Sequence, residues 1–226
     1  MTISRPAIRS FFLPGPAGRL EALLNEGAGG ATHSALVCHP HPLGGGTMHN
    51  KVVFHAMKAL NAFGFPVLRF NFRGTGLSEG QHDEGRGEIA DVEAALAWLK
   101  REFGRPIIFA GFSFGSATGL RAACPDPDVK ALISIGTPVE AAGHLYSYSF
   151  LRDCAKPKLF VSGDHDEYGP REKLEKLIAE VAEPKKLVFV PGDHFFQGYL
   201  SELRVAVESW VRELLETKSS SEAKPS

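Results

Sequence analysis

The chain has 226 residues, of which 43% are hydrophobic and 23% are charged, and its formal net charge is -1 at pH 7. These values are ordinary for one globular domain with a large core, and they offer no basic face for nucleic acid or an anionic membrane. The opening residues lack the pattern of a secretory leader, and no apolar run is long enough to cross a bilayer.

Apolar, β-rich runs alternate with stretches of helical periodicity along the chain. The runs predict strands at 9–13, 33–38, 65–72, 106–112, 129–136, 156–163 and 185–192. Apolar residues at helical spacing predict helices at 50–64, 87–104, 116–123, 170–184 and 199–216. Strands that are apolar throughout and separated by helices indicate an α/β protein with a mostly parallel sheet covered on both faces. The segment 18–24 is expected to pair with the first strand as an antiparallel hairpin at one edge.

Residues 1–216 are therefore interpreted as one domain, and the polar segment 217–226 as a disordered tail. The three cysteines Cys38, Cys124 and Cys154 are widely spaced and odd in number. They form no disulfide framework, and we expect a reducing, cytoplasmic environment.

The stretch "GFSFG" places Ser113 between a predicted strand and a predicted helix. A sharp strand-to-helix turn holds a serine in a strained conformation that only small neighbours tolerate, here Gly111 and Gly115. The hydroxyl then lies beside a helix N-terminus, which favours developing negative charge. A serine that merely caps the helix is the alternative, and the context favours a nucleophile.

A serine hydroxyl needs a base, and the base needs an orienting carboxylate. His194 follows the last predicted strand, and the turn "GDHDE" after the preceding strand offers Asp164, Asp166 and Glu167. The negative charge of acyl transfer also needs N–H donors. One is expected to be the amide of Phe114; the other comes from the loop "HPHPLGGG", in which the prolines have no N–H and the candidates are His41, Leu43 and Gly44.

Four stretches together resemble the α/β-hydrolase superfamily, and more narrowly its small, lid-poor bacterial serine hydrolases of the dienelactone-hydrolase-like kind. They are "HPHPLGGGTMHNKVV", "RFNFRGTGLSEG", "GFSFGS" and "GDHDEYGP…PGDHFF". The resemblance implies a sheet of about eight strands, a Ser113–Asp166–His194 triad in that family's chain order, and His41 as the second oxyanion donor. It does not carry over the dienelactone substrate, because the nucleophile here is a serine and not a cysteine.

The segment between the strands at 129–136 and 156–163 has room for a short cap only, so we expect an open site. Leu43, Tyr146, Tyr148 and Phe195 are candidate apolar residues of its wall, although packing onto the core is an equal alternative for the tyrosines. We expect a cofactor-free serine hydrolase that acts on small ester or thioester substrates.

Two other functions stay open at this stage. The His-x-His pair 39–41, with His49, His55 and Asp164, suits a zinc site and hence a metal-dependent hydrolase. A hydrolase-like scaffold that only binds a ligand or partner is the other, since a fold does not determine a function. The loop "RGTGLSEG" lacks the last glycine of a dinucleotide fingerprint, so we interpret it, with Arg73 and Ser78, as a brace beneath the site.

Overall fold

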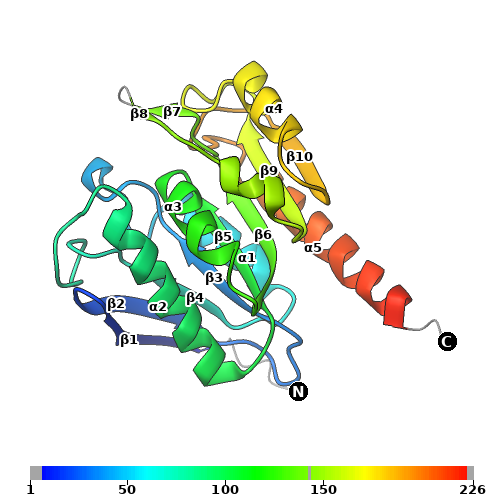
Figure 1. Ribbon diagram of the computed structural model, residues 1–226. Helices are drawn as coiled ribbons and strands as arrows, with labels where there is room; N and C mark the ends of the chain where they lie inside the picture. Colours follow the sequence, from blue (N-terminus) through cyan, green and yellow to red (C-terminus); the bar gives the residue numbers. More distant parts are fainter. Residues whose placement is uncertain (1–6, 142–143, 223–226) are drawn as a thin grey trace.

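The computed structural model describes residues 7–141 and 144–222, and its centre is one eight-stranded sheet (Figure 1). The strand order is β1-β2-β4-β3-β5-β6-β9-β10. The strands are β1 (Ile8–Gly15), β2 (Gly18–Asn25), β3 (Ser34–Cys38), β4 (Val67–Phe70), β5 (Ile107–Phe112), β6 (Val129–Ile135), β9 (Lys158–Gly163) and β10 (Lys185–Val190). A separate hairpin contains β7 (Glu140–Ala141) and β8 (His144–Leu145).

The six strands from β4 to β10 in this order run parallel, and the hairpin β1–β2 joins them antiparallel through β2. The hairpin register runs from Ile8 opposite Asn25 to Gly15 opposite Gly18. The predicted mostly parallel sheet of about eight strands, with an antiparallel hairpin at one edge, is confirmed. Parallel strands end at a common edge, and in such sheets that edge is where sites form.

Helices cover both faces of the sheet. They are α1 (Lys51–Asn61), α2 (Arg86–Phe103), α3 (Phe114–Ala123), α4 (Arg171–Ala179) and α5 (Leu200–Glu222), with the short 3-10 turns η1 (Pro42–Gly44) and η2 (Ser149–Asp153). α1 and α5 pack on one face, and α2, α3 and α4 on the other (Figure 1). Each face has its own apolar cluster because each helix turns one apolar stripe toward the sheet.

Local signals explain several helix ends. The Asn50 side chain accepts a hydrogen bond from the Val52 amide at 2.9 Å and caps the start of α1. Gly104 has φ 58° and ends α2 in a left-handed turn. α4 ends at Ala179, before the expected stop near Pro184, because the amide of Ala182 donates to the carbonyl of Leu151 at 3.1 Å and not to its own helix.

The last helix differs from its prediction. α5 continues to Glu222, so residues 217–222 are helical and do not form the expected disordered tail; residues 223–226 lie outside the described residues. Polar side chains extend a helix that α1 and the sheet have already ordered, since adding residues to an existing helix costs far less than starting one. Among the described helices, α5 included, none combines the length and apolarity needed to span a membrane.

Candidate active site

Ser113 lies at the sharp turn between β5 and α3. Its backbone has φ 54° and ψ −119°, a conformation that L-residues rarely adopt. Its amide donates to the carbonyl of Ile135 at 2.9 Å, which ties the turn to the end of β6. The strain is therefore held by the neighbouring strand, and the hydroxyl lies at the carboxyl edge beside the first turn of α3.

Two glycines make this turn sterically possible. A Cβ at position 111 would lie 2.5 Å from the Gly115 carbonyl oxygen, and one at position 115 would lie 2.3 Å from the His39 carbonyl oxygen. A clash with these backbone atoms cannot be relieved by a change of rotamer, as a clash with a flexible side chain can. The "GFSFG" spacing is therefore required by close contact of α3 with β5 and with the end of β3.

His194 brings the serine and a carboxylate together. Its Nε2 lies 2.9 Å from Ser113 Oγ, and its Nδ1 lies 2.8 Å from Asp166 Oδ2. Because a carboxylate only accepts hydrogen bonds, Nδ1 carries the proton and Nε2 is the acceptor that faces the serine hydroxyl. His194 and Asp166 are both buried, so the chain Ser113–His194–Asp166 is shielded from water except at the serine end.

The turn after β9 distinguishes its two aspartates. Asp166 also accepts hydrogen bonds from the amides of Tyr168 and Gly169, at 2.9 and 3.1 Å, and from Ser162 Oγ at 3.1 Å. Asp164 instead accepts from the amide of Gly192 at 2.9 Å and has no hydrogen bond to His194 among the described contacts. The carboxylate next to His194 is that of Asp166, whereas Asp164 holds the turn to the Gly192 amide.

Two of the three candidate amides in the loop after β3 are used by contacts within the loop. The Leu43 amide donates to His41 Nδ1 at 3.2 Å, and the Gly44 amide donates to the His41 carbonyl at 3.0 Å. Within the described residues, the His41 amide has no recorded acceptor. The Phe114 amide begins α3 and has no intrahelical acceptor by geometry. The His41 and Phe114 rings lie 4.8 Å apart between centroids, so the two residues are neighbours.

His39 is held in one neutral form. Its Nδ1 donates to the Pro40 carbonyl at 2.7 Å, and its Nε2 accepts from the Phe72 amide at 3.0 Å. Both ring nitrogens are therefore used, and His39 has no lone pair for a metal in this arrangement. Within 7–141 and 144–222, no three His, Cys, Asp or Glu side chains are grouped to hold a metal ion. The zinc alternative therefore has no ligand set among these residues.

The burial of the His39 ring makes the stability of the fold sensitive to acid. Desolvation lowers its pKa from 6.5 to about 4. Below the ordinary pKa the unfolded chain binds a proton that the folded chain does not, so the free energy of unfolding falls as pH falls. We expect a loss of about 3 kcal/mol from this group between about pH 7 and about pH 4.

Urea titrations across that range measure this loss. His39→Gln is the comparison, because it removes the titration and leaves the other histidines. The variant is expected to be less stable near neutral pH, yet to lose less stability on acidification than the wild type. Parallel pH profiles of the two proteins would assign the acid sensitivity to other groups.

The four predicted wall residues separate into two kinds. Leu43 on η1 is 77% exposed, and Phe195 is 49% exposed with its ring 5.2 Å from that of His194.

Tyr146 is half-buried and packs against the core cluster that includes residues of α3. Tyr148 is buried and its hydroxyl donates to the Pro138 carbonyl at 2.8 Å. For Tyr148 these contacts favour the alternative of packing onto the core, because its ring is buried and its hydroxyl already has a hydrogen-bond partner.

Three nearby residues were not predicted. Ser162, at the end of β9, donates to Asp166, and the Tyr168 ring lies 4.6 Å from the His194 ring. His82 lies 5.0 Å from the His41 ring, measured between centroids. No pattern marks them, except that Ser162 and Tyr168 flank the acid turn by a few residues.

The glycine-rich loop after β4, which is predicted to brace the site, is held by its own contacts with neighbouring elements. Arg73 and Asp91 form a two-pronged ion pair with a shortest distance of 2.8 Å, and the Asp91 side chain is fully buried. Ser78 Oγ donates to the Asn71 carbonyl at 2.7 Å and accepts from the Glu21 amide at 2.9 Å. These contacts fix the glycine-rich loop after β4 to α2 and β2.

In this parallel sheet a strained serine follows β5, and a histidine and a carboxylate lie on later turns at the same edge. This order of the three side chains is typical of α/β proteins of the hydrolase class. A family model described as alpha/beta hydrolase fold matches residues 36–146. The chain belongs to the α/β-hydrolase superfamily, and its fold is the α/β-hydrolase fold.

Several proteins match this chain in sequence or structure over nearly its whole length. An alpha-beta serine hydrolase homologue from Coxiella burnetii is 39% identical, with a TM-score of 0.82 over 89% of this chain and 96% of that one. A serine hydrolase without lid from Xanthomonas campestris is 33% identical, with a TM-score of 0.80 over 92% and 94%. The uncharacterized protein RP471 of Rickettsia prowazekii is 33% identical over 88% of this chain and 87% of its own length.

Proposed function

We propose that this protein is a serine hydrolase that cleaves small ester or thioester substrates through an acyl-enzyme intermediate. The observation that carries the proposal is the unbroken hydrogen-bonded chain from Ser113 Oγ through His194 to Asp166. Two serine hydrolase relatives above 30% identity support the reaction class.

Each step of the proposed reaction is assigned to one of these three side chains. Ser113 Oγ attacks the acyl carbon while His194 Nε2 accepts its proton, and His194 then passes that proton to the leaving group. Asp166 keeps the proton of the neutral ring on Nδ1 and stabilises the imidazolium that forms. A water molecule, activated by the same histidine, hydrolyses the acyl-enzyme. The mechanism requires no cofactor.

The amides of Phe114 and His41 are assigned to the oxyanion that develops on the acyl oxygen. The Phe114 amide lies at the start of α3, and the His41 amide lies in the loop after β3. The close approach of Gly115 to the His39 carbonyl keeps these two segments together. Donors that are fixed before the substrate binds need no reorganisation during the reaction. The helix N-terminus adds its own favourable field.

The open surroundings support a small acyl substrate. Between β6 and β9 the described residues form only the hairpin β7–β8 and the turn η2, and Leu43 and Phe195 present apolar surface to solvent. We place the protein in the cytoplasm, in keeping with its three free thiols.

A fluorophosphonate probe tests the proposal directly. An activated serine is expected to be labelled at Ser113, as mapped by peptide mass spectrometry. A folded chain in which Ser113 stays unlabelled would instead support a binding scaffold with no hydrolase activity.

The oxyanion assignment has its own test at position 41. His41 has φ −54° and ψ 122°, values that proline accepts, so His41→Pro removes the amide hydrogen without asking for a new backbone conformation there. Loss of one such donor is expected to lower kcat by about 10²–10³. His41→Ala loses the ring but keeps the amide and is expected to stay within about tenfold of the wild type. Equal losses of kcat in the two variants would assign the effect to the ring and not to the amide. Circular dichroism checks that both variants are folded.

A further inference from the structure

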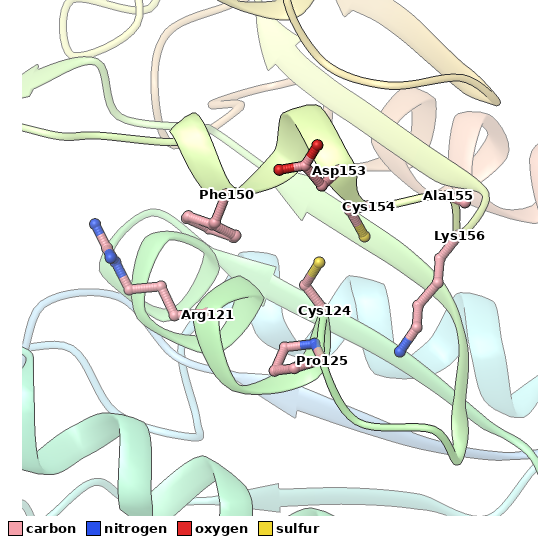
Figure 2. A pocket seen from close by; sticks show the side chains of 8 residues that line it. All are labelled: Arg121, Cys124, Pro125, Phe150, Asp153, Cys154, Ala155 and Lys156. Atoms are coloured by element: carbon pink, nitrogen blue, oxygen red, sulfur yellow. The ribbon is translucent and has the colours of Figure 1, made fainter.

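A second group of reactive side chains lies at the other end of α3, away from Ser113. Cys124 directly follows α3, and Cys154 directly follows η2. Both thiols are free, and both line a cavity of about 660 Å³. Figure 2 shows the two sulfur atoms turned toward each other from these two separate elements.

Two lysines place positive charge beside the sulfur pair. The Lys158 ammonium is buried and donates to the carbonyl of Lys156 at 2.6 Å, and also to that of Cys154. The Lys156 ammonium donates to the Ala123 carbonyl at 3.0 Å and to that of Asp126. Both lysines are thus held by main-chain oxygens, and in the described part of the chain neither forms an ion pair with a carboxylate. Positive charges held in this way stabilise a thiolate.

The two thiols are unequal. The facing Cys124 thiol, the Lys156 amide and the two ammonium groups lower the pKa of Cys154 against the opposing effect of burial. The facing Cys154 sulfur and burial raise the pKa of Cys124. The buried Lys158 ammonium contacts the carbonyl of Cys154 itself, so Cys154 is assigned as the sulfur that attacks first and Cys124 as its partner.

We propose that Cys124 and Cys154 form a thiol-modification site that reacts with low-molecular-weight disulfides entering this cavity. The Cys154 thiolate attacks one sulfur of the small disulfide, whose S–S bond breaks and releases one thiolate. Cys124 then loses its proton and attacks Cys154 Sγ, which releases the second small thiol. The protein dithiol is oxidised by two electrons, and the small disulfide is reduced to two thiols.

The surroundings suit an anionic small disulfide. Arg121 and Lys156 bring positive charge to the cavity, opposed by Asp153 alone among its lining carboxylates, and Phe150 gives an apolar wall (Figure 2). The site shares no residue with the Ser113–His194–Asp166 chain. The proposed thiol site can therefore be tested independently of the proposed hydrolase activity.

The test exposes the folded, full-length protein to oxidised glutathione and maps the products by peptide mass spectrometry. The wild type is expected to form the Cys124–Cys154 disulfide. Cys124→Ser is expected to retain glutathione on Cys154, and Cys154→Ser to form neither product on that timescale. Cys38, which is fully buried in the core, is the internal control thiol.

A second measurement needs no cysteine variant and so does not depend on whether the variants fold. Limiting iodoacetamide near pH 7 is expected to alkylate Cys154 at least about tenfold faster than Cys38. Equal rates at the two residues, the absence of the disulfide in the wild type, or capture of glutathione on Cys124 first would each overturn the proposal. The Ser113→Ala protein is expected to behave as the wild type here, which separates this result from any hydrolase result.

Discussion

Replacing Ser113 by alanine is expected to lower the turnover of a small nitrophenyl ester by up to about 10⁶-fold. The reason is the loss of the Ser113 hydroxyl oxygen, the proposed nucleophile, which lies 2.9 Å from His194 Nε2. The rate that remains comes from the oxyanion donors and from substrate binding. Steady-state kinetics with p-nitrophenyl acetate measure the loss, and the fluorophosphonate label is expected to disappear from the same variant.

The matched control is Ser149→Ala, an exposed serine on η2. It removes a hydroxyl whose described hydrogen bond is to Ser147 and not to His194, and it is expected to leave both turnover and labelling unchanged. Alanine at 113 keeps the strained backbone, so circular dichroism and Tm should show a folded chain. More than a few per cent of wild-type activity in a folded Ser113→Ala protein would remove Ser113 from the nucleophile role.

Asp166→Asn is expected to lower kcat by about 10⁴-fold with little change in Tm. The amide that replaces the carboxylate can donate to His194 Nδ1, which then gives up its proton and leaves Nε2–H facing the serine. In that tautomer the ring cannot accept the Ser113 proton. The hydrogen bonds from Tyr168 and Gly169 can persist to the remaining carbonyl oxygen, so the turn itself is kept.

Asp164→Asn is the matched comparison two residues away. Asp164 accepts from the Gly192 amide, and an asparagine oxygen can accept the same hydrogen bond. Its kcat is therefore expected to stay within about tenfold of the wild type. Equal small losses in both variants would mean that neither aspartate orients the base, and a larger loss at 164 would reverse the assignment.

Much of the fold and site follows from local sequence signals because those signals act over short distances. Gly111 and Gly115 indicate a close backbone contact, and a serine between them at a strand-to-helix junction predicts the sharp turn that the structure has. The strand-end positions of His194 and of the acid turn place their side chains at a shared edge once the sheet is parallel. Choosing Asp166 over Asp164 required the family resemblance, since composition alone treats the two carboxylates alike.

The remaining features depend on contacts between distant segments. The sequence makes Tyr148 a candidate for the substrate wall, but its hydroxyl donates to the Pro138 carbonyl and its ring packs in the core cluster. α4 ends early because Ala182 bonds to Leu151 across the fold. The pairing of Cys124 with Cys154 is of the same kind: the residues lie far apart in sequence, and only the meeting of α3 and η2 makes them neighbours.

The close approach of Gly115 to the His39 carbonyl restricts which residues position 115 can accept. A Cβ there would lie 2.3 Å from that carbonyl oxygen, so any larger residue would force the start of α3 away from the end of β3 and displace the amides assigned to the oxyanion. Leu43 and Phe195 are 77% and 49% exposed, so their side chains can be changed with much less disturbance of the core. Variants with altered substrate preference are therefore expected at positions 43 and 195, with glycine kept at position 115.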